Sequence, residues 1–279
     1  MKCFGITDIG KKRSVNQDCF GIKKLSDDIY IIAAFDGMGG ANGGEIASAT
    51  AMESFFALCE AELCDGCTQE DATAILYNAV ATANEKVYRL SLTSPELNGM
   101  GTTLVAAILC ANGGCNVLTD DDVKTYCPAG ESDSVNELTE SAPAVPSVEA
   151  FITNVGDSRA YLYFGGELTQ LTKDHSYVQY LVDKGELSPA RAARHPQRNI
   201  IMKAIGIEST VLPDVQTKSI PEGACIMLVS DGLYSEARPS EIKRILGSKK
   251  SIEEKTEALV KLANRRGGHD NITVVLAEI

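Results

Sequence analysis

The sequence predicts an α+β fold in which helices pack on the outer faces of antiparallel sheets. Three observations lead to this prediction. Apolar runs of strand length recur along the chain, two long amphipathic helical patterns follow the first three runs, and further helical patterns come late in the chain. The chain has 279 residues, of which 44% are hydrophobic, so it can bury a core of ordinary size. We expect a single domain over residues 1–279.

The expected strands are short apolar segments separated by polar turns. They lie at 2–9, 18–24, 29–35, 102–110, 149–155, 159–164, 167–171, 224–230 and 271–277. All of these runs are far shorter than the roughly 20 residues that a membrane-spanning helix needs. The N-terminus becomes polar at Thr7 and Asp8, which argues against the apolar core of a signal peptide. A cytoplasmic protein is therefore the expectation.

The first two expected helices each carry one apolar stripe, with spacings of three and four residues. The first stripe runs from Met52 to Leu63, and the second runs from Ala72 to Leu90. A helix with a single stripe is expected to lie against a sheet. Later helices are predicted to begin at Ser188-Pro189, to span 239–246, and to run from a capping box at Ser251 and Glu254 to about Arg266.

The stretch 111–148 differs from the rest of the chain. It holds seven acidic residues against one lysine, together with three prolines and a Gly-Gly pair. This composition predicts a flexible acidic insertion within the domain and not a domain boundary. The run Asp120-Asp121-Asp122 fits a solvated loop better than a metal site.

Charge and cysteine content narrow the classes of partner. The 38 acidic and 26 basic residues give a formal charge of −12, which disfavours nucleic acid and anionic membranes as partners. Cys64-Asp65-Gly66-Cys67 has the spacing of a redox pair or of half a zinc site, but no second pair with matching spacing follows it. The nine cysteines are therefore expected to be mostly buried, reduced thiols, as in a reducing cytoplasm.

Five aspartates stand at the ends of apolar strands, beside glycine, asparagine or a turn: Asp18, Asp36, Asp157, Asp231 and Asp270. One such aspartate is typical of a turn. Five in the same setting favour a shared site, where converging carboxylates would repel one another unless cations lay between them. Mg²⁺ and Mn²⁺ prefer such oxygen-rich surroundings.

Six motifs in order resemble the type 2C metal-dependent protein serine/threonine phosphatases, in particular their bacterial branch. The motifs are Thr7-Asp8-Ile9-Gly10 with Arg13 and Asn16-Gln17-Asp18, Asp36-Gly37-Met38-Gly39-Gly40, Gly101-Thr102-Thr103, Asn154-Val155-Gly156-Asp157-Ser158-Arg159, Ser230-Asp231-Gly232 and Asp270-Asn271-Ile272-Thr273. The resemblance implies a four-layer αββα fold, with a central sandwich of two antiparallel sheets and helices on both outer faces. It also implies hydrolysis of phosphoserine and phosphothreonine in proteins by metal-activated water at one edge of the sandwich.

The resemblance further implies a metal centre of Mg²⁺ or Mn²⁺. Asp36 matches the carboxylate that bridges the first two ions, and Gly37 matches the residue whose carbonyl binds the second. Asp231 and Asp270 match the other ligands of the first ion. Asp36, Asp231 and Asp270 are accordingly the candidate catalytic residues.

Three further residues complete the site that the resemblance implies. Asp18 matches a residue that holds metal-bound water, and Asp157, together with Asp231, matches the site of a third, weaker ion. Arg13 matches the arginine that grips the substrate phosphate, for which its planar guanidinium is suited. The expected partners are phosphorylated proteins, with a serine/threonine kinase acting in opposition, and a monomer is expected.

No histidine is assigned to catalysis, because Met38 stands where relatives outside the bacterial branch carry a histidine. The segment 175–205 matches the mobile flap of the family. Arg159 is expected to be structural and to pair with the adjacent Asp157, and Asn271 is expected to belong to a turn or to support the metal ligands.

Two alternatives stay open at this point. The first is a weak or inactive relative that binds phosphoproteins as a regulator, suggested by Gln17 where the family usually has glutamate. The second is an acidic metal buffer or scaffold protein.

Overall fold

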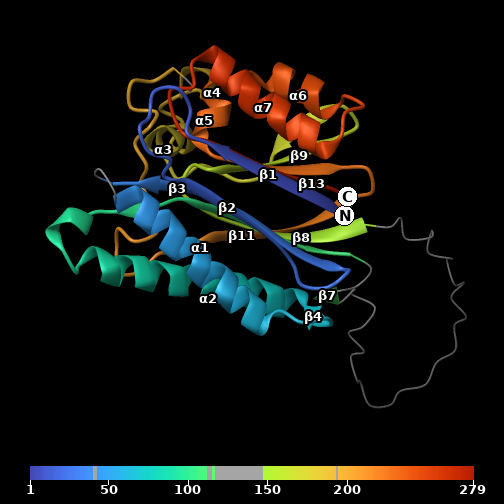
Figure 1. Cartoon of the computed structure of the whole chain (residues 1–279), viewed down its shortest axis with the longest axis horizontal. Coiled ribbons are helices and arrows are strands. Elements are labelled where there is room, and N and C mark those ends of the chain that lie inside the picture. Colours follow the sequence, from blue (N-terminus) through green and yellow to red (C-terminus); the bar gives the residue numbers. More distant parts are fainter. Residues whose placement is uncertain (40–42, 112–114, 117–146, 193) are drawn as a thin grey trace, which may run out of the picture.

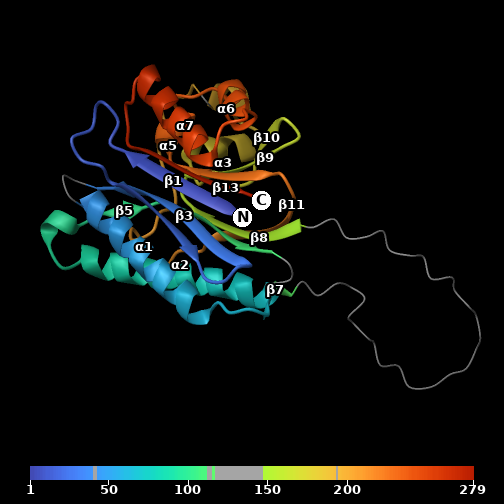
Figure 2. The same ribbon diagram turned by 45° about the vertical axis from the view of Figure 1, so that its right-hand side comes forward.

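A computed structural model describes residues 1–39, 43–111, 115–116, 147–192 and 194–279. Two antiparallel sheets stack face to face, and helices cover both outer faces, so the expected four-layer fold is confirmed. Figures 1 and 2 both show the two long helices α1 and α2 under one sheet and α6 and α7 over the other.

The first sheet has the order β1-β13-β12-β9-β10. Its strands are β1 (Lys2–Asp8), β13 (Ile272–Glu278), β12 (Cys225–Val229), β9 (Arg159–Phe164) and β10 (Glu167–Gln170). The pairing of Lys2 with Glu278 brings the two chain ends side by side, as Figure 1 shows.

The second sheet has the order β11-β8-β6-β3-β2, and a short strand β5 continues the pairing along β3. Its strands are β11 (Asp214–Pro221), β8 (Ser147–Val155), β6 (Leu104–Cys110), β3 (Ile29–Met38), β2 (Asp18–Lys24) and β5 (Gly101–Thr102). A separate parallel pair consists of β4 (Cys67–Thr68) and β7 (Cys115–Asn116).

The alternation of side chains along β3 explains how the layers pack. Ile31 and Phe35 point into the core between the second sheet and the helices α1 (Gly43–Glu62) and α2 (Gln69–Ser91). Ile32 lies on the other face and packs in the core between the two sheets. Both faces of β3 are buried, so the strand is a continuous apolar run with no polar face.

The second helical layer packs on the first sheet through a separate apolar core. It contains α5 (Asp231–Tyr234), α6 (Pro239–Leu246) and α7 (Ile252–Arg266). The predicted capping box of α7 is confirmed: the Ser251 hydroxyl accepts from the Glu254 backbone N–H at 3.3 Å, and Glu254 accepts from the Ser251 N–H at 3.0 Å.

The remaining helices are short. A 3₁₀ turn spans Pro95–Leu97. The segment that connects β10 to β11 along the chain carries α3 (Tyr177–Asp183) and α4 (Pro189–Ala192). Helix α4 begins at the predicted Ser188-Pro189 start, whereas α3 was not predicted.

Some boundaries differ from the sequence prediction for identifiable reasons. Helix α1 begins at Gly43, well before Met52, because its first half faces the sheet with small residues such as Ala47 and Ala51 and leaves no visible apolar stripe. Strand β3 continues past residue 35 to Met38 because β5 pairs with its end. Strand β11 was missed because, as an edge strand, it is mostly polar.

The predicted acidic insertion lies largely outside the described residues, and Asp120-Asp121-Asp122 lies wholly outside them. Strand β8 begins at Ser147, inside the predicted insertion. Within the described residues, none of the helices is long and apolar enough to cross a membrane.

The prediction of reduced cysteines is right for six of them and wrong for Cys110. The six free thiols are Cys3, Cys19, Cys59, Cys64, Cys67 and Cys225, whereas Cys110 is disulfide-bonded. In the C-x-x-C segment the two sulfur atoms lie 3.5 Å apart.

Candidate functional site

The first two predicted aspartates face each other across neighbouring strands. Asp18 opens β2, and Asp36 lies near the end of β3, where the two residues are register partners. This follows from antiparallel pairing, which places the start of one strand beside the end of its neighbour. Both side chains therefore lie where the strands of the second sheet end, at one edge of the sandwich.

The other three aspartates come from strand ends that meet this edge. Asp157 follows β8, Asp231 is the first residue of α5 just after β12, and Asp270 precedes β13. Strands β12 and β13 pair so that Val229 lies opposite Val274, which keeps the segments of Asp231 and Asp270 adjacent. The structure thus brings together all five predicted aspartates.

The carboxylates influence one another strongly. Burial, followed by Asp18 and the other three aspartates, holds the pKa of Asp36 well above its usual value. Burial, followed by Asp157, Asp270 and Asp18, does the same for the pKa of Asp231. In both cases the ionised form is disfavoured because charge is removed from water beside like charge. The edge is a site of concentrated negative charge.

Asp18 is fixed by hydroxyl groups on two strands of the other sheet. The Ser230 hydroxyl donates to Asp18 Oδ2 at 2.7 Å, and the Thr273 hydroxyl lies 2.8 Å from the same oxygen. Burial nevertheless raises the pKa of Asp18 to about 6. The roles of Ser230 and Thr273 were not predicted, although both stand within motifs beside a predicted aspartate.

Two carboxylate oxygens at this edge are buried without a hydrogen-bond partner. They are Oδ1 of Asp18 and Oδ1 of Asp231, and no other buried side-chain nitrogen or oxygen in the described residues is in this state. An unsatisfied buried acceptor is costly, and native sites of this kind call for a missing partner such as an ion or water. A hard cation is the partner that also relieves the repulsion between the carboxylates.

The site offers a cation both carboxylate oxygens and other oxygens as ligands. Among the described residues, no three acidic, histidine or cysteine side chains are placed to hold one ion by themselves. Mg²⁺ is ordinarily bound by only one or two carboxylates and keeps several waters, so a cage is not required. The residues present fit ions of this class.

Gly37 follows Asp36 at a point where the backbone segments crowd together. A Cβ at Gly37 would overlap the carbonyl oxygens of Gly44 and Gln17, so only glycine fits between β3 and the start of α1. The Gly37 N–H donates to the Gln17 carbonyl at 3.1 Å. This contact holds the loop before Asp18 against the end of β3.

Arg13 lies in the loop between β1 and β2 and reaches the cluster. Its Nη2 is 2.7 Å from Asp270 Oδ2, and its side chain is 49% exposed. Asn271 holds this loop in place by donating to the carbonyls of Ile9 and Val15 at 3.0 Å each and by accepting from the Gln17 N–H at 2.9 Å. The supporting role expected for Asn271 is therefore confirmed.

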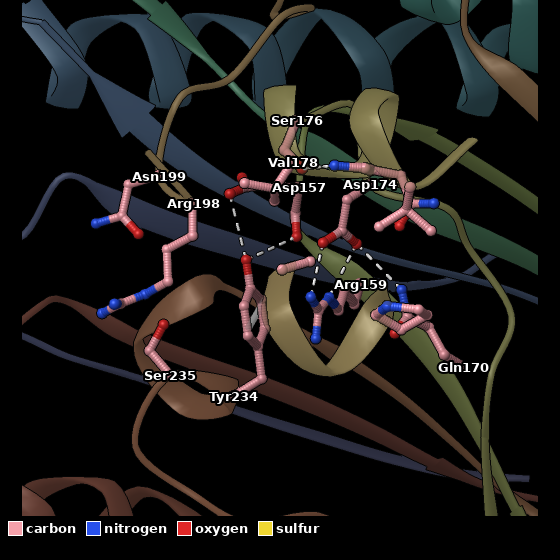
Figure 3. A pocket seen from close by; sticks show the side chains of 14 residues that line it. Asp157, Arg159, Gln170, Asp174, Ser176, Val178, Arg198, Asn199, Tyr234 and Ser235 are labelled. Carbon is pink, nitrogen blue, oxygen red and sulfur yellow. Dashed lines mark hydrogen bonds and ion pairs between the residues drawn. The ribbon is translucent and has the colours of Figure 1, made fainter. Parts of the chain in front are cut away.

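Asp157 is held by a residue that the sequence reasoning missed. The Tyr234 hydroxyl lies 3.1 Å from the Asp157 carbonyl and 3.3 Å from its Oδ2, as Figure 3 shows. Burial, with a smaller contribution from Asp174, raises the pKa of Asp157 to about 6, although the Tyr234 hydrogen bond opposes the shift. The available signal was the position of Tyr234, one helical turn after Asp231 in α5.

Arg159 pairs with a carboxylate, as expected, but the carboxylate is Asp174. Its Nε and Nη2 contact the two oxygens of Asp174 at 2.9 and 2.6 Å, and its guanidinium stacks 3.7 Å from the centre of the Tyr234 ring. Arg159 therefore braces the tyrosine that holds Asp157.

The flap, residues 175–205, is attached beside Asp157. The His175 N–H donates to the Gly156 carbonyl at 2.8 Å, and the Gly156 N–H donates to His175 Nδ1 at 3.1 Å. These two hydrogen bonds hold the start of the flap against the loop that carries Asp157. Backbone pairing of Ser176 with Ile201 closes the base of the flap.

The chain is similar to known proteins in both sequence and structure. Residues 9–119 match the family described as protein phosphatase 2C. Over 272 residues the chain is 34% identical to the serine/threonine phosphatase Stp of Listeria monocytogenes, covering 98% of this chain and 93% of that one. It is 32% identical over 276 residues to the protein phosphatase PhpP of Streptococcus pneumoniae, covering 98% and 96%.

Two solved structures are similar over almost the whole length. The serine/threonine phosphatase of S. agalactiae superimposes with a TM-score of 0.80 at 32% identity, covering 100% of this chain and 99% of that one. The catalytic domain of the serine/threonine protein phosphatase PstP in complex with two manganese ions gives a TM-score of 0.73 at 30% identity, covering 99% and 97%.

Proposed function

The chain belongs to the protein phosphatase 2C family, and we propose that the five aspartates at the sandwich edge form its metal-dependent catalytic centre. The protein is a metal-dependent serine/threonine phosphatase of the bacterial type, and its substrates are phosphorylated proteins. One observation carries the proposed site: five buried or half-buried carboxylates converge, and two of them keep a buried oxygen without a partner.

We propose two ions, Mg²⁺ or Mn²⁺, at the core of the site. Asp36 and the Gly37 carbonyl would hold one of them, and Asp36 with Asp231 and Asp270 the other. Asp18 would orient water in the shell of these ions. When bound, the ions would lower the pKa of water and neutralise the phosphoryl oxygens. Support comes from the relative that binds two manganese ions and from the chemistry of the oxygen donors.

A third, weaker ion is proposed between Asp157 and Asp231. Tyr234 holds one oxygen of Asp157 and leaves the other for a ligand bond. Asp157 contributes, after burial, to the raised pKa of Asp231, and this supports the pairing because such an effect requires the two carboxylates to be close.

Arg13 is proposed to bind the phosphate of the substrate. In the structure the guanidinium of Arg13 contacts Asp270. A cation bound at Asp270 would take the place of the guanidinium, which would then be able to turn toward solvent and contact a phosphate. Hydrolysis forms a bond between water oxygen and phosphorus and breaks the bond to the serine or threonine oxygen. The planar guanidinium can contact two phosphoryl oxygens while this happens.

The test is hydrolysis of p-nitrophenyl phosphate and of a phosphothreonine peptide with and without Mn²⁺. We expect Mn²⁺-dependent turnover of both. An inactive phosphoprotein-binding relative would hydrolyse neither, and a metal buffer would bind Mn²⁺ without turnover. The inactive alternative gains no support from the relatives, which are named as phosphatases.

We also propose that residues 1–279 form one catalytic domain with a flap at 175–205, that the protein is a monomer, and that it opposes a serine/threonine kinase. A cytoplasmic location is proposed because six cysteines are free thiols, with the disulfide-bonded Cys110 as the exception. Light scattering during gel filtration tests the monomer.

A further inference from the structure

A cavity of about 620 Å³ lies between the flap and α5. Its volume is within the range of about 300–1,000 Å³ typical of ligand sites. Asp157 belongs both to the acidic cluster and to the lining of this cavity, so the cavity adjoins the reaction centre. Figure 3 shows Arg198, Asn199 and Ser235 on one side of it, Arg159 and Asp174 on the other, and Tyr234 between the two groups.

The two arginines of the cavity are in different states. Arg159 donates two hydrogen bonds to Asp174 and stacks on the Tyr234 ring. Arg198 is exposed, and no ion pair to it exists among the residues that the structure describes. The cavity therefore has one guanidinium that is available to a ligand.

The flap has the opposite charge from the protein that carries it. Residues 175–205 hold five basic and two acidic residues, in a chain of formal charge −12. Asp183, one of the two acidic residues, is already paired with Lys173. A positive surface beside a negative cluster, on an otherwise acidic protein, complements an acidic stretch of polypeptide.

We propose that this cavity is a subsite for an acidic side chain next to the phosphorylated residue of the substrate, and that Arg198 binds its carboxylate. This inference rests on the proposed function. Neighbouring residues of an extended peptide are about 3.3–3.6 Å apart, so a residue close to the phosphoresidue reaches the adjoining cavity. The guanidinium fork suits a carboxylate, and the Asn199 amide and Ser235 hydroxyl offer further donors.

The experiment compares two phosphothreonine peptides that differ only by glutamate or glutamine at positions flanking the phosphoresidue. The readout is the ratio of kcat/KM for the two peptides at fixed Mn²⁺ and low salt. Wild-type protein should prefer the glutamate peptide by roughly tenfold, the effect of one charge-assisted hydrogen bond. Arg198→Ala should bring the ratio close to one, and Arg198→Glu should reverse the preference.

Arg191→Ala is the matched control. Arg191 belongs to the same flap and carries the same charge, but it does not line the cavity. The ratio for this variant should stay at the wild-type value. An equal fall in Arg191→Ala and Arg198→Ala would overturn the subsite, since the preference would then arise from the overall charge of the flap.

The outcomes also separate this inference from the proposed function. If the wild type hydrolyses both peptides with a ratio near one, or if Arg198→Ala keeps the wild-type ratio, the subsite is wrong and the phosphatase stands. If the wild type hydrolyses neither a peptide nor p-nitrophenyl phosphate with Mn²⁺, the proposed function is wrong and the subsite falls with it.

Discussion

The acidic cluster and the flap lie side by side but are built in opposite ways. The cluster is negative and buried or half-buried, and its side chains project from the ends of paired strands. The flap is positive and largely exposed, and its two helices have only seven and four residues. Rigid strand ends can hold repelling charges at fixed positions, whereas short exposed helices can adapt to the surface of another protein. Under the proposed function, the rigid strand ends serve the chemistry and the exposed flap serves the recognition of the substrate.

Tyr234 and His175 join the two regions. Tyr234 stands on α5, beside the cluster, and its hydroxyl contacts Asp157. His175, at the base of the flap, exchanges hydrogen bonds with Gly156. Movement of the flap base would therefore displace Asp157 first. It would displace Asp36 and Asp18 last, because Asp36 lies within β3 and Asp18 is held by Ser230 and Thr273.

The largest effect is expected from the cluster itself. Asp36→Asn and Asp231→Asn should each lower kcat by at least about 100-fold, because each removes a negative charge from a centre that contributes several kcal/mol to the transition state. The measurement is Mn²⁺-dependent turnover of p-nitrophenyl phosphate at saturating metal. Near wild-type turnover by either folded variant would show that the site is misassigned.

Asp36→Asn should lower turnover but raise the stability of the metal-free protein. In protein treated with chelator, Asp36→Asn should raise the midpoint of thermal unfolding, because a neutral amide ends both the burial of a charge and the repulsion from the other aspartates, which together raise the pKa of Asp36. Arg191→Ala in the flap is the control and should change stability by no more than about 0.5 kcal/mol, as an exposed substitution. A lower unfolding midpoint for Asp36→Asn would mean that the carboxylate stabilises the metal-free fold.

The next effect concerns Arg13, the cation at the cluster. Arg13→Ala should raise KM for a phosphopeptide more than it lowers kcat, by about 10- to 100-fold, since a charge-assisted contact with phosphate contributes about 1.5–3 kcal/mol. Steady-state kinetics at low salt measure this. An unchanged KM would remove Arg13 from the phosphate site and leave its contact with Asp270 as its only role.

The cluster was more predictable from sequence than the flap for physical reasons. The aspartates could be found because each follows or opens an apolar strand, and strand ends are positioned by local patterns. The connection of Tyr234 to Asp157 could not be found, because a hydrogen bond between α5 and the loop after β8 depends on tertiary packing. Helix α3 was missed because it has only seven residues and buries only Val178, so no apolar stripe repeats along it. Strand β11 was missed because it is mostly polar.

A smaller effect is expected at the junction of the two regions. Tyr234→Phe removes the hydroxyl that contacts Asp157 but keeps the ring on which Arg159 stacks. We expect about a tenfold loss of affinity for the weakest Mn²⁺ ion, with the two tighter ions unaffected, since such supporting hydrogen bonds orient metal ligands. Isothermal titration with Mn²⁺ measures the number and affinity of the ions. A uniform loss at all sites would indicate general damage to the centre instead.

The smallest effect should come from Gln17, which stands between the cluster and the start of α1. Its backbone is fixed by Asn271, Gly37 and Ser48, and its side chain lies against Gly44 in the first turn of the helix. Gln17→Glu keeps the shape and adds one negative charge close to a helix N-terminus and to the ions proposed at Asp36 and Gly37. The added charge should lower the Mn²⁺ concentration that gives half-maximal rate, while kcat at saturating Mn²⁺ stays nearly constant. Titration of both proteins with Mn²⁺ at fixed substrate tests this. Superimposable curves would mean that a water molecule separates residue 17 from the ion and that the amide serves as well as the carboxylate.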